Sequence, residues 1–163
     1  MIKIDKNLLN ETSDFAKKSE RKRKNYNFHK IAEDTLQRML NAIEPGTYVQ
    51  PHKHENPDKR EAFIILRGKA LVIEFDNFGN ISDYFILDYS TENVAVEISA
   101  KVYHTLISLS SNTIVYELKD GPYKVENDKN FAKWAPKEGD TSVNEYLKNL
   151  IEKIEILEKS EHK

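Results

Sequence analysis

Three histidines and one glutamate are the residues of this sequence best suited to do chemistry. His52 and His54 stand two residues apart, and because successive strand residues point to opposite faces, both imidazoles would point the same way. Glu61 follows the turn-forming stretch ENPDKR, so a chain reversal there would bring its carboxylate back beside the imidazoles. His104 would add a third imidazole from a remote strand. Together the four side chains predict a metal site.

The ligand types limit the metal. Imidazole and carboxylate suit Mn, Fe, Co, Ni, Cu or Zn, and the sequence has no cysteine to supply a thiolate. We expect a divalent transition metal (Fe, Mn, Zn, Ni or Co) whose identity the sequence leaves open. Four protein ligands leave positions free on a six-coordinate metal, which favours a catalytic ion. A His-x-His alone is also compatible with a solvated loop pair, but the downstream Glu61 and the bracketing Gly46 and Gly68 favour metal binding.

The middle of the chain has the pattern of a double-sheet jelly roll. Its short segments are apolar or alternating, and turn signals such as Gly79 separate them without an intervening helix. The predicted strands cover residues 35–43, 47–52, 62–66, 70–75, 81–88, 94–98, 104–109 and 114–119.

A helix is predicted at each end of the chain. Residues 5–19 and the segment after Ser142 both repeat apolar residues at helical spacing, and Ser142 with Glu145 forms a capping box. The two apolar stripes are Leu8, Leu9, Phe15 and Ala16 with Thr12, and Val143, Leu147, Leu150, Ile154 and Leu157. We expect the second stripe to pack on the barrel or on a dimer partner.

These elements divide the chain into three segments. We predict an N-terminal helix and basic arm over residues 1–30, a β-barrel over 31–125, and a strap loop with the C-terminal helix over 126–163. Phe131 and Trp134 would anchor the strap, since large aromatics contribute most to fixing irregular chain. A sugar-stacking role for Trp134 is an alternative.

The basic run Arg21 to Lys24 allows three interpretations. It is compatible with a nucleic-acid or targeting patch, but in a chain of slight net acidity it is more typical of a solvated helix end. In the third interpretation Arg21, Arg23, Asn27 and His29 fold over the barrel mouth, where the guanidinium groups bind a carboxylate or phosphate of a ligand.

Strand alternation assigns further residues to the barrel interior. Tyr48 and Gln50 should share the inward face with His52 and His54. We predict Tyr48 as a catalytic residue that contacts substrate or a metal-bound water and moves or stabilises a proton, and Gln50 as a ligand contact; packing is the alternative for Tyr48. Glu117 is a further candidate acid, base or ligand contact.

Composition supports one globular domain with a highly charged surface. The chain has 163 residues, of which 39% are hydrophobic and 32% charged, and its net charge is -2. This small negative net charge does not favour binding to nucleic acid. No apolar run approaches the roughly 20 residues that span a bilayer. The N-terminal residues lack the apolar core of a signal peptide, which favours the cytoplasm.

The metal-site region resembles the first cupin motif. In that motif a glycine is followed after five residues by His-x-His, then by a glutamate and, six residues later, a second glycine; Gly46, His52, His54, Glu61 and Gly68 fit it. The gap between His54 and Glu61 is longer than usual, which implies an enlarged hairpin. His104 stands where the second motif has its ligand histidine. The resemblance implies a cupin double-stranded β-helix with a metal in the barrel.

From about residue 21 to 139 the chain resembles one group of cupins, the WbuC family. The segments that carry the likeness are RKRKNYNFH, QRMLNAIEPGTYVQPHKH, REAFIILRGKALVIEFDNFGNI, VYHT and YELKDGPYKVENDKNFAKWAPKEG. The family is often encoded among bacterial surface-polysaccharide genes, which implies a sugar or sugar-nucleotide ligand and polysaccharide biosynthesis. A metal-dependent isomerase or epimerase, an iron-dependent dioxygenase and a non-catalytic binding or regulatory module all stay open. We expect a homodimer, because strand exchange and sheet-edge pairing are common among cupin relatives.

Overall fold

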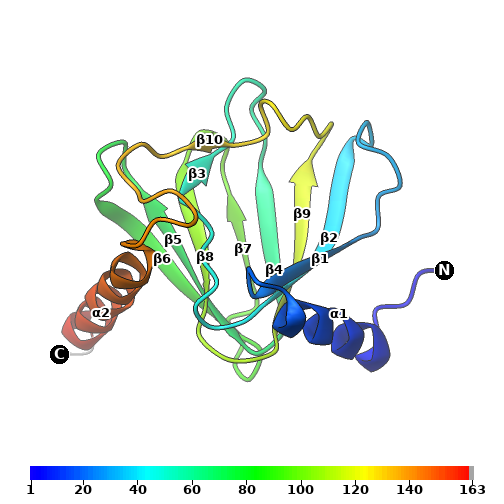
Figure 1. Ribbon diagram of the computed structural model, residues 1–163, viewed down its shortest axis with the longest axis horizontal. Helices are drawn as coiled ribbons and strands as arrows, with labels where there is room; N and C mark the ends of the chain where they lie inside the picture. Colours follow the sequence, from blue (N-terminus) through cyan, green and yellow to red (C-terminus); the bar gives the residue numbers. More distant parts are fainter. Residues whose placement is uncertain (162–163) are drawn as a thin grey trace.

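Two antiparallel sheets face each other in the computed structural model, which describes residues 1–161 (Figure 1). The first sheet has the strand order β1 (Arg23–Asn27), β2 (Leu36–Ile43), β9 (Thr113–Asp120), β4 (Glu61–Arg67) and β7 (Ala95–Ile98). The second has the order β10 (Asn130–Phe131), β3 (His52–Lys53), β8 (Tyr103–Ser108), β5 (Lys69–Phe75) and β6 (Ile81–Asp88). This arrangement confirms the predicted fold class: a mainly β cupin jelly roll with a helix at each end.

Alternation within the strands builds an apolar core at one end of the space between the sheets. In β4 every second residue faces inward, so Phe63 and Ile65 are buried while Ala62 and Ile64 are only partly covered. The inward residues of the other strands complete the cluster, which comprises Ile43, Phe63, Ile65, Ala70, Val72, Leu87, Ile98, Leu106 and Val115. The other end of the barrel is polar.

Helix α1 (Lys6–Lys18) covers the outer face of the first sheet (Figure 1). Asp5 caps its first turn by accepting hydrogen bonds from the backbone N–H groups of Asn7 and Leu8. Its buried Ala16 packs with Leu40 and Ile114 of the sheet. The predicted amphipathic helix is therefore confirmed, within one residue at each end.

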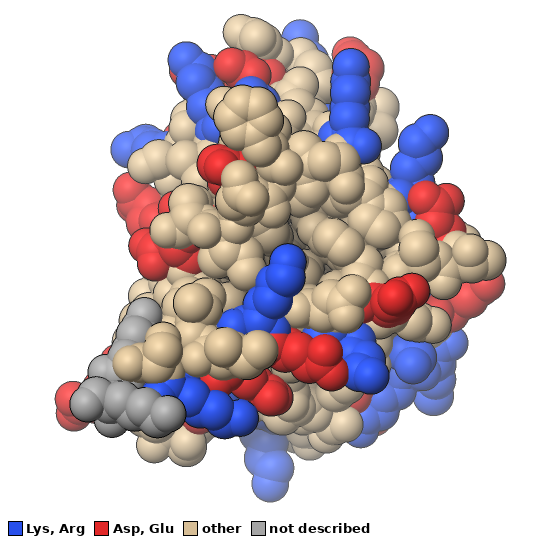
Figure 2. Space-filling view, turned by 90° about the vertical axis from the view of Figure 1, so that its left-hand side faces the viewer, with Lys and Arg blue, Asp and Glu red and all other residues tan. Residues whose placement is uncertain are grey.

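Helix α2 (Val143–Glu161) packs against the outer face of the second sheet. Leu147, Leu150 and Ile154 are buried there, whereas Leu157 is exposed. On this side of the molecule, uncharged residues cover much of the upper half, and a basic side chain projects near the centre (Figure 2). No helix among the described residues has both the length and the apolar character needed to cross a membrane.

Two strands were missed by the sequence analysis, and one was misplaced. Strand β1 incorporates part of the predicted basic arm into the first sheet, and β10 is a short strand of the strap. Most of the predicted strand at residues 47–52 is irregular, and β3 only begins at His52. Pro51 lacks a backbone N–H and so cannot continue a ladder through this segment.

The strap, residues 121–139, crosses the rim of the barrel (Figure 1). Its strand β10 pairs with β3, and the Trp134 ring lies 5.1 Å from that of Phe75 and 5.8 Å from that of Tyr103. Gly79 supports this contact, because a Cβ added at its positive φ would come within 2.8 Å of the Trp134 ring. Trp134 thus anchors the strap on the outside of the barrel, while Phe131 faces the internal cavity.

Candidate metal centre

The four candidate ligands come together at the polar end of the barrel. His52 of β3 lies directly opposite His104 of β8 in the second sheet, and Glu61 reaches the same point from the start of β4 in the first. His54 follows β3 on the same face as His52. All four side chains are buried, with exposed fractions of 2 or 3%.

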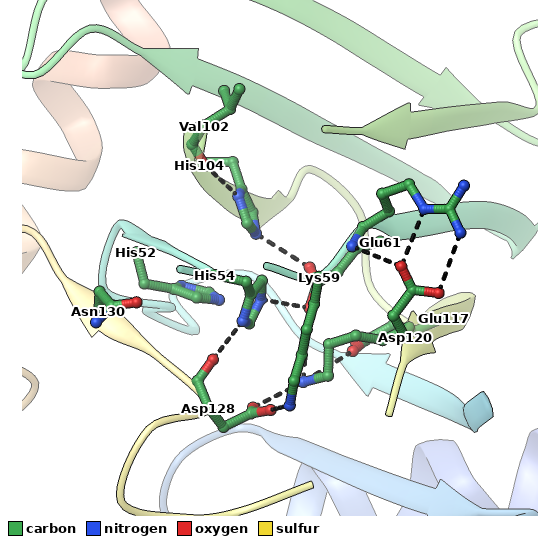
Figure 3. Close-up of polar contacts among 12 residues, drawn as sticks. His52, His54, Lys59, Glu61, Val102, His104, Glu117, Asp120, Asp128 and Asn130 are labelled. Atoms are coloured by element: carbon green, nitrogen blue, oxygen red, sulfur yellow. Dashed lines mark hydrogen bonds and ion pairs between the residues drawn. The ribbon is translucent and has the colours of Figure 1, made fainter. Parts of the chain in front are cut away.

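Their ligand atoms lie within 4.8 Å of one another. Oε1 of Glu61 is 2.7 Å from Nε2 of His54, and its Oε2 is 3.0 Å from Nε2 of His104 (Figure 3). The rings of His52 and His104 are 4.6 Å apart. One ion placed among these atoms would be within reach of three nitrogens and a carboxylate.

Backbone carbonyls assign the tautomer of each histidine. Nδ1 of His52 lies 2.9 Å from the carbonyl of Gln50, Nδ1 of His104 lies 3.0 Å from that of Val102, and Nδ1 of His54 contacts that of Asp128. A carbonyl only accepts, so each Nδ1 must donate, and each neutral ring then keeps a lone pair on Nε2. Such outer hydrogen bonds are the usual means of orienting metal-bound histidines.

The Nε2 lone pairs have no protein donor to satisfy them. Nε2 of His52 and of His54 are buried atoms without a hydrogen-bond partner among the described residues. Glu61 can accept a hydrogen bond from Nε2 of His104 or His54 only when that ring carries a second proton, and a bound metal ion would take the place of such a proton. Buried acceptors that converge in this way need a cation, and the mixed nitrogen and oxygen set fits a divalent transition metal.

The electrostatics of the cluster suit the same role. Burial lowers the pKa of His52 well below its usual range, and the charge of Lys129 lowers it further. Burial opposes ionisation of Glu61, but its contacts with His104 and His54 outweigh that cost and hold its pKa well below the usual range. A neutral imidazole and an ionised carboxylate are the forms that bind metals.

A second buried cluster lies beside the candidate ligands. Nζ of Lys59 is 2.9 Å from Oδ1 of Asp128 (Figure 3). It is also 2.6 Å from the carbonyl of Pro122, and Nζ of Lys119 is 2.7 Å from Oδ2 of Asp128. Burial lowers the pKa of Lys119, but Glu61, Glu117 and Asp128 outweigh it, so the net shift is upward and the amine stays charged. Sequence reasoning missed this cluster because a lone strand lysine and two loop residues carry no pattern.

A cavity of about 780 Å³ adjoins the metal centre. The candidate ligands His52, Glu61 and His104 line it together with strands β1, β2 and β9, and the strap covers it from the other side. Its size is within the range of small-molecule sites.

Five of the residues predicted at the barrel mouth or as ligand contacts do line this cavity: Arg21, Arg23, Asn27, His29 and Glu117. The two arginines already share a partner, since Glu138 of the strap lies 2.6 Å from Nε of Arg21 and 2.9 Å from Nη2 of Arg23. His29 is held by the backbone of Arg38 at 3.1 Å.

The predicted inward positions of Tyr48 and Gln50 are wrong. Tyr48 packs with the α2 side of the second sheet, and its hydroxyl donates to the carbonyl of Pro136 at 2.7 Å. Gln50 donates to the carbonyl of Ala132 in the strap at 3.3 Å. The alternation rule failed because the segment before His52 is not a strand.

Two residues that the sequence analysis overlooked also line the cavity. Asn41 lies on the inward face of β2, two residues before the core residue Ile43. Lys129 follows Asp128 in the strap. Strand alternation with Ile43 could have indicated that Asn41 faces inward. Nothing in the sequence indicates where the side chain of Lys129 points.

The fold and the site together define a cupin-fold protein with a buried group suited to metal binding. A family model described as a domain of unknown function, DUF6016, matches residues 4–87, and the chain belongs to that family. No curated protein matches its sequence.

Two solved structures share the fold at low identity, and a third is less similar. CapF with the inhibitor 3-isopropenyl-tropolone has a TM-score of 0.54 and 20% identity over 64% of this chain, but only 30% of the CapF chain is covered. The L-ribose isomerase of Cellulomonas parahominis, solved with L-psicose, has a TM-score of 0.53 and 13% identity over 69% of this chain and 70% of its own. The cupin domain of Schizosaccharomyces pombe Cnp3 has a TM-score of 0.46 and 16% identity, with 60% and 64% covered.

Proposed function

We propose that this protein is a cupin metalloprotein that holds a divalent transition metal through His52, His54, Glu61 and His104 and acts on a small polar ligand in the adjoining cavity. The observation that carries the proposal is the convergence of the Nε2 atoms of three buried histidines and the carboxylate of Glu61 within 4.8 Å, while each Nδ1 is held by a backbone carbonyl. Fe, Mn, Zn, Ni and Co all accept this ligand set.

The groups around the site have separate roles in the proposed function. The bound metal would supply Lewis-acid chemistry toward an oxygen of the ligand. The backbone carbonyls of Gln50, Val102 and Asp128 keep the imidazoles oriented, and the strap separates the cavity from bulk water on one side. Glu117, whose pKa is raised by burial and by nearby Glu61, is the cavity carboxyl best placed to hold or release a proton.

The ligand we favour is a sugar or sugar nucleotide in polysaccharide biosynthesis. The likeness of residues 21–139 to the WbuC family supports it, and one protein with the same fold is an L-ribose isomerase solved with L-psicose. Isomerisation or epimerisation would be the reaction. We place the protein in the cytoplasm and expect a homodimer, for which Ile156 and Leu157 offer exposed apolar surface on α2.

A second candidate is a metal-containing binding or regulatory module without turnover. It is favoured by the complete burial of Nε2 of His52 and of His54, which restricts approach to the metal to the cavity side. An iron-dependent dioxygenase with the same ligands is the third candidate.

Proton NMR in deuterated water separates these candidates. Untagged wild type and His104→Ala, each loaded with Fe²⁺ or Mn²⁺, are incubated with aldoses, uronic acids and sugar nucleotides under nitrogen and under air. Turnover under nitrogen that the variant loses supports the isomerase, and turnover only in air supports the dioxygenase. Binding without turnover supports the module, and neither binding nor turnover contradicts a small polar ligand.

A further inference from the structure

An amide and a carboxyl form a polar pair on the cavity wall. Asn41 of β2 and Glu117 of β9 face inward on neighbouring strands, diagonally across the ladder, and Nδ2 of Asn41 donates to Oε2 of Glu117. Both residues line the cavity, and each is only 8% exposed. The pair is fixed by two regular strands, so its orientation does not depend on a loop.

This pair has acceptor atoms that the protein leaves without a donor. Oδ1 of Asn41 is buried and has no hydrogen-bond partner in residues 1–161. Oε1 of Glu117 has Lys119 as its nearest cation, at 4.0 Å, which is longer than a hydrogen bond. A buried acceptor without a donor is costly, so the wall is suited to a ligand that brings hydroxyl donors. Two adjacent hydroxyls on one carbon chain would match two acceptors on one wall.

A cationic side chain enters the same cavity from the strap. Lys129 lines the cavity near His52, Glu61 and Glu117, and within the described part of the chain it has no ion pair or hydrogen bond. Lys59 and Lys119 are both paired with Asp128, and Lys24 of β1 lines the cavity from the opposite side. An anionic group on a ligand would give Lys129 the partner that the protein does not supply.

We infer that the cavity selects a polyhydroxylated anion, a sugar acid or a sugar phosphate, whose hydroxyls bind Asn41 and Glu117 and whose anionic group pairs with Lys129. The inference rests on the proposed function, because the same ligand lies beside the metal centre. It adds the ligand's charge and the residues that recognise each part. Neutral sugars of the same stereochemistry are then the weaker ligands.

Calorimetric titration of matched ligands tests this selectivity. The probes are glucose, galactose and mannose, each beside its uronic acid and its 1-phosphate, titrated into untagged metal-loaded protein. We expect at least one anionic member to bind about 10-fold or more tightly than its neutral sugar. Comparison of the uronic acids with the 1-phosphates identifies whether the cavity prefers a carboxylate or a phosphate.

Three variants assign the recognition to residues. Lys129→Gln should reduce the affinity for the anionic probe to that for its neutral sugar, while Lys133→Gln, an exposed strap lysine outside the cavity lining, should change nothing. Asn41→Ala should weaken the anionic and neutral sugars by the same factor and leave inorganic phosphate binding unchanged. Asn41→Ser, which keeps a polar group, repeats the test should the alanine variant unfold.

Two outcomes overturn the inference: equal binding of charged and neutral probes, or an anion preference that Lys129→Gln retains. Elemental analysis of each variant keeps this test distinct from that of the proposed function. Asn41 and Lys129 are not metal ligands, so their variants should keep the metal. Selective anion binding by a wild type that holds no metal would remove the metalloprotein proposal and leave this inference standing.

Discussion

Two buried polar clusters lie side by side in this barrel, and they differ in how well the protein satisfies them. In the first, which is the lysine cluster beside the metal centre, Lys59 and Lys119 both contact the carboxylate of Asp128, so the charges are paired within the chain. In the second, His52 and His54 keep buried Nε2 atoms without a donor. The first cluster is complete by itself, whereas the second is complete only with a cation.

The difference separates a structural role from a functional one. Burial alone does not mark a site, because Lys59 is among the most deeply buried side chains of the described chain and has both its partners. Unsatisfied atoms that converge on one point do mark one. Breaking each cluster should therefore have a different consequence: loss of stability for the first and loss of metal for the second.

Removing the shared carboxylate should have the largest effect on stability. Asp128→Ala leaves Lys59 and Lys119 buried without their common partner, and breaking a buried ion pair costs about 3–5 kcal/mol of unfolding free energy. Urea denaturation of the two proteins measures the loss. Asp120→Ala, which breaks the exposed pair with Arg60, is the matched control and should cost about 1 kcal/mol or less. Equal losses in the two variants would contradict the structural role of the buried cluster.

Removing the metal should have an intermediate effect. At a free metal concentration about 100 times Kd, binding adds about 2.7 kcal/mol, or about 5 to 11 °C of Tm for a domain of this size. Differential scanning calorimetry with added metal and with chelator measures the shift. The double variant His52→Ala, His54→Ala should show no shift, and a shift as large as that of the wild type would place the metal elsewhere.

Breaking an exposed pair at the cavity mouth should have the smallest effect. Burial raises the pKa of Glu138, but Arg21 and Arg23 lower it by a larger amount. The net result is a pKa below the usual value of 4.5. The carboxylate thus stabilises the fold above that value, and the contribution disappears as pH falls through the lowered folded-state pKa. Because Glu138 is 40% exposed, we expect Glu138→Gln to cost about 1 kcal/mol or less at pH 7.

Urea denaturation at pH 7 and at pH 3, in low and high salt, checks this last expectation. The difference between wild type and Glu138→Gln should shrink at pH 3 and in high salt, since screening weakens exposed pairs. A difference that grows as the pH falls would mean that the carboxyl is stabilised in its protonated form.

The fold could be predicted because short alternating segments leave few arrangements, and the four candidate ligands because His52, His54 and Glu61 follow a compact spacing. Tyr48 was misplaced because alternation holds only within a strand, and its segment is irregular. Asp128 and Lys129 were missed for a related reason: the strap has no periodicity, so only its contacts show which residues reach the cavity.

Elemental analysis of untagged protein, purified without chelators, tests the central claim most directly. Wild type and His29→Ala, which alters a histidine of the cavity wall outside the cluster, should both carry near-stoichiometric transition metal. The double variant His52→Ala, His54→Ala should carry little. Metal equally low in all three proteins, and not restored by added Fe²⁺, Mn²⁺, Zn²⁺, Ni²⁺ or Co²⁺, would contradict the claim that the converging lone pairs form a metal centre.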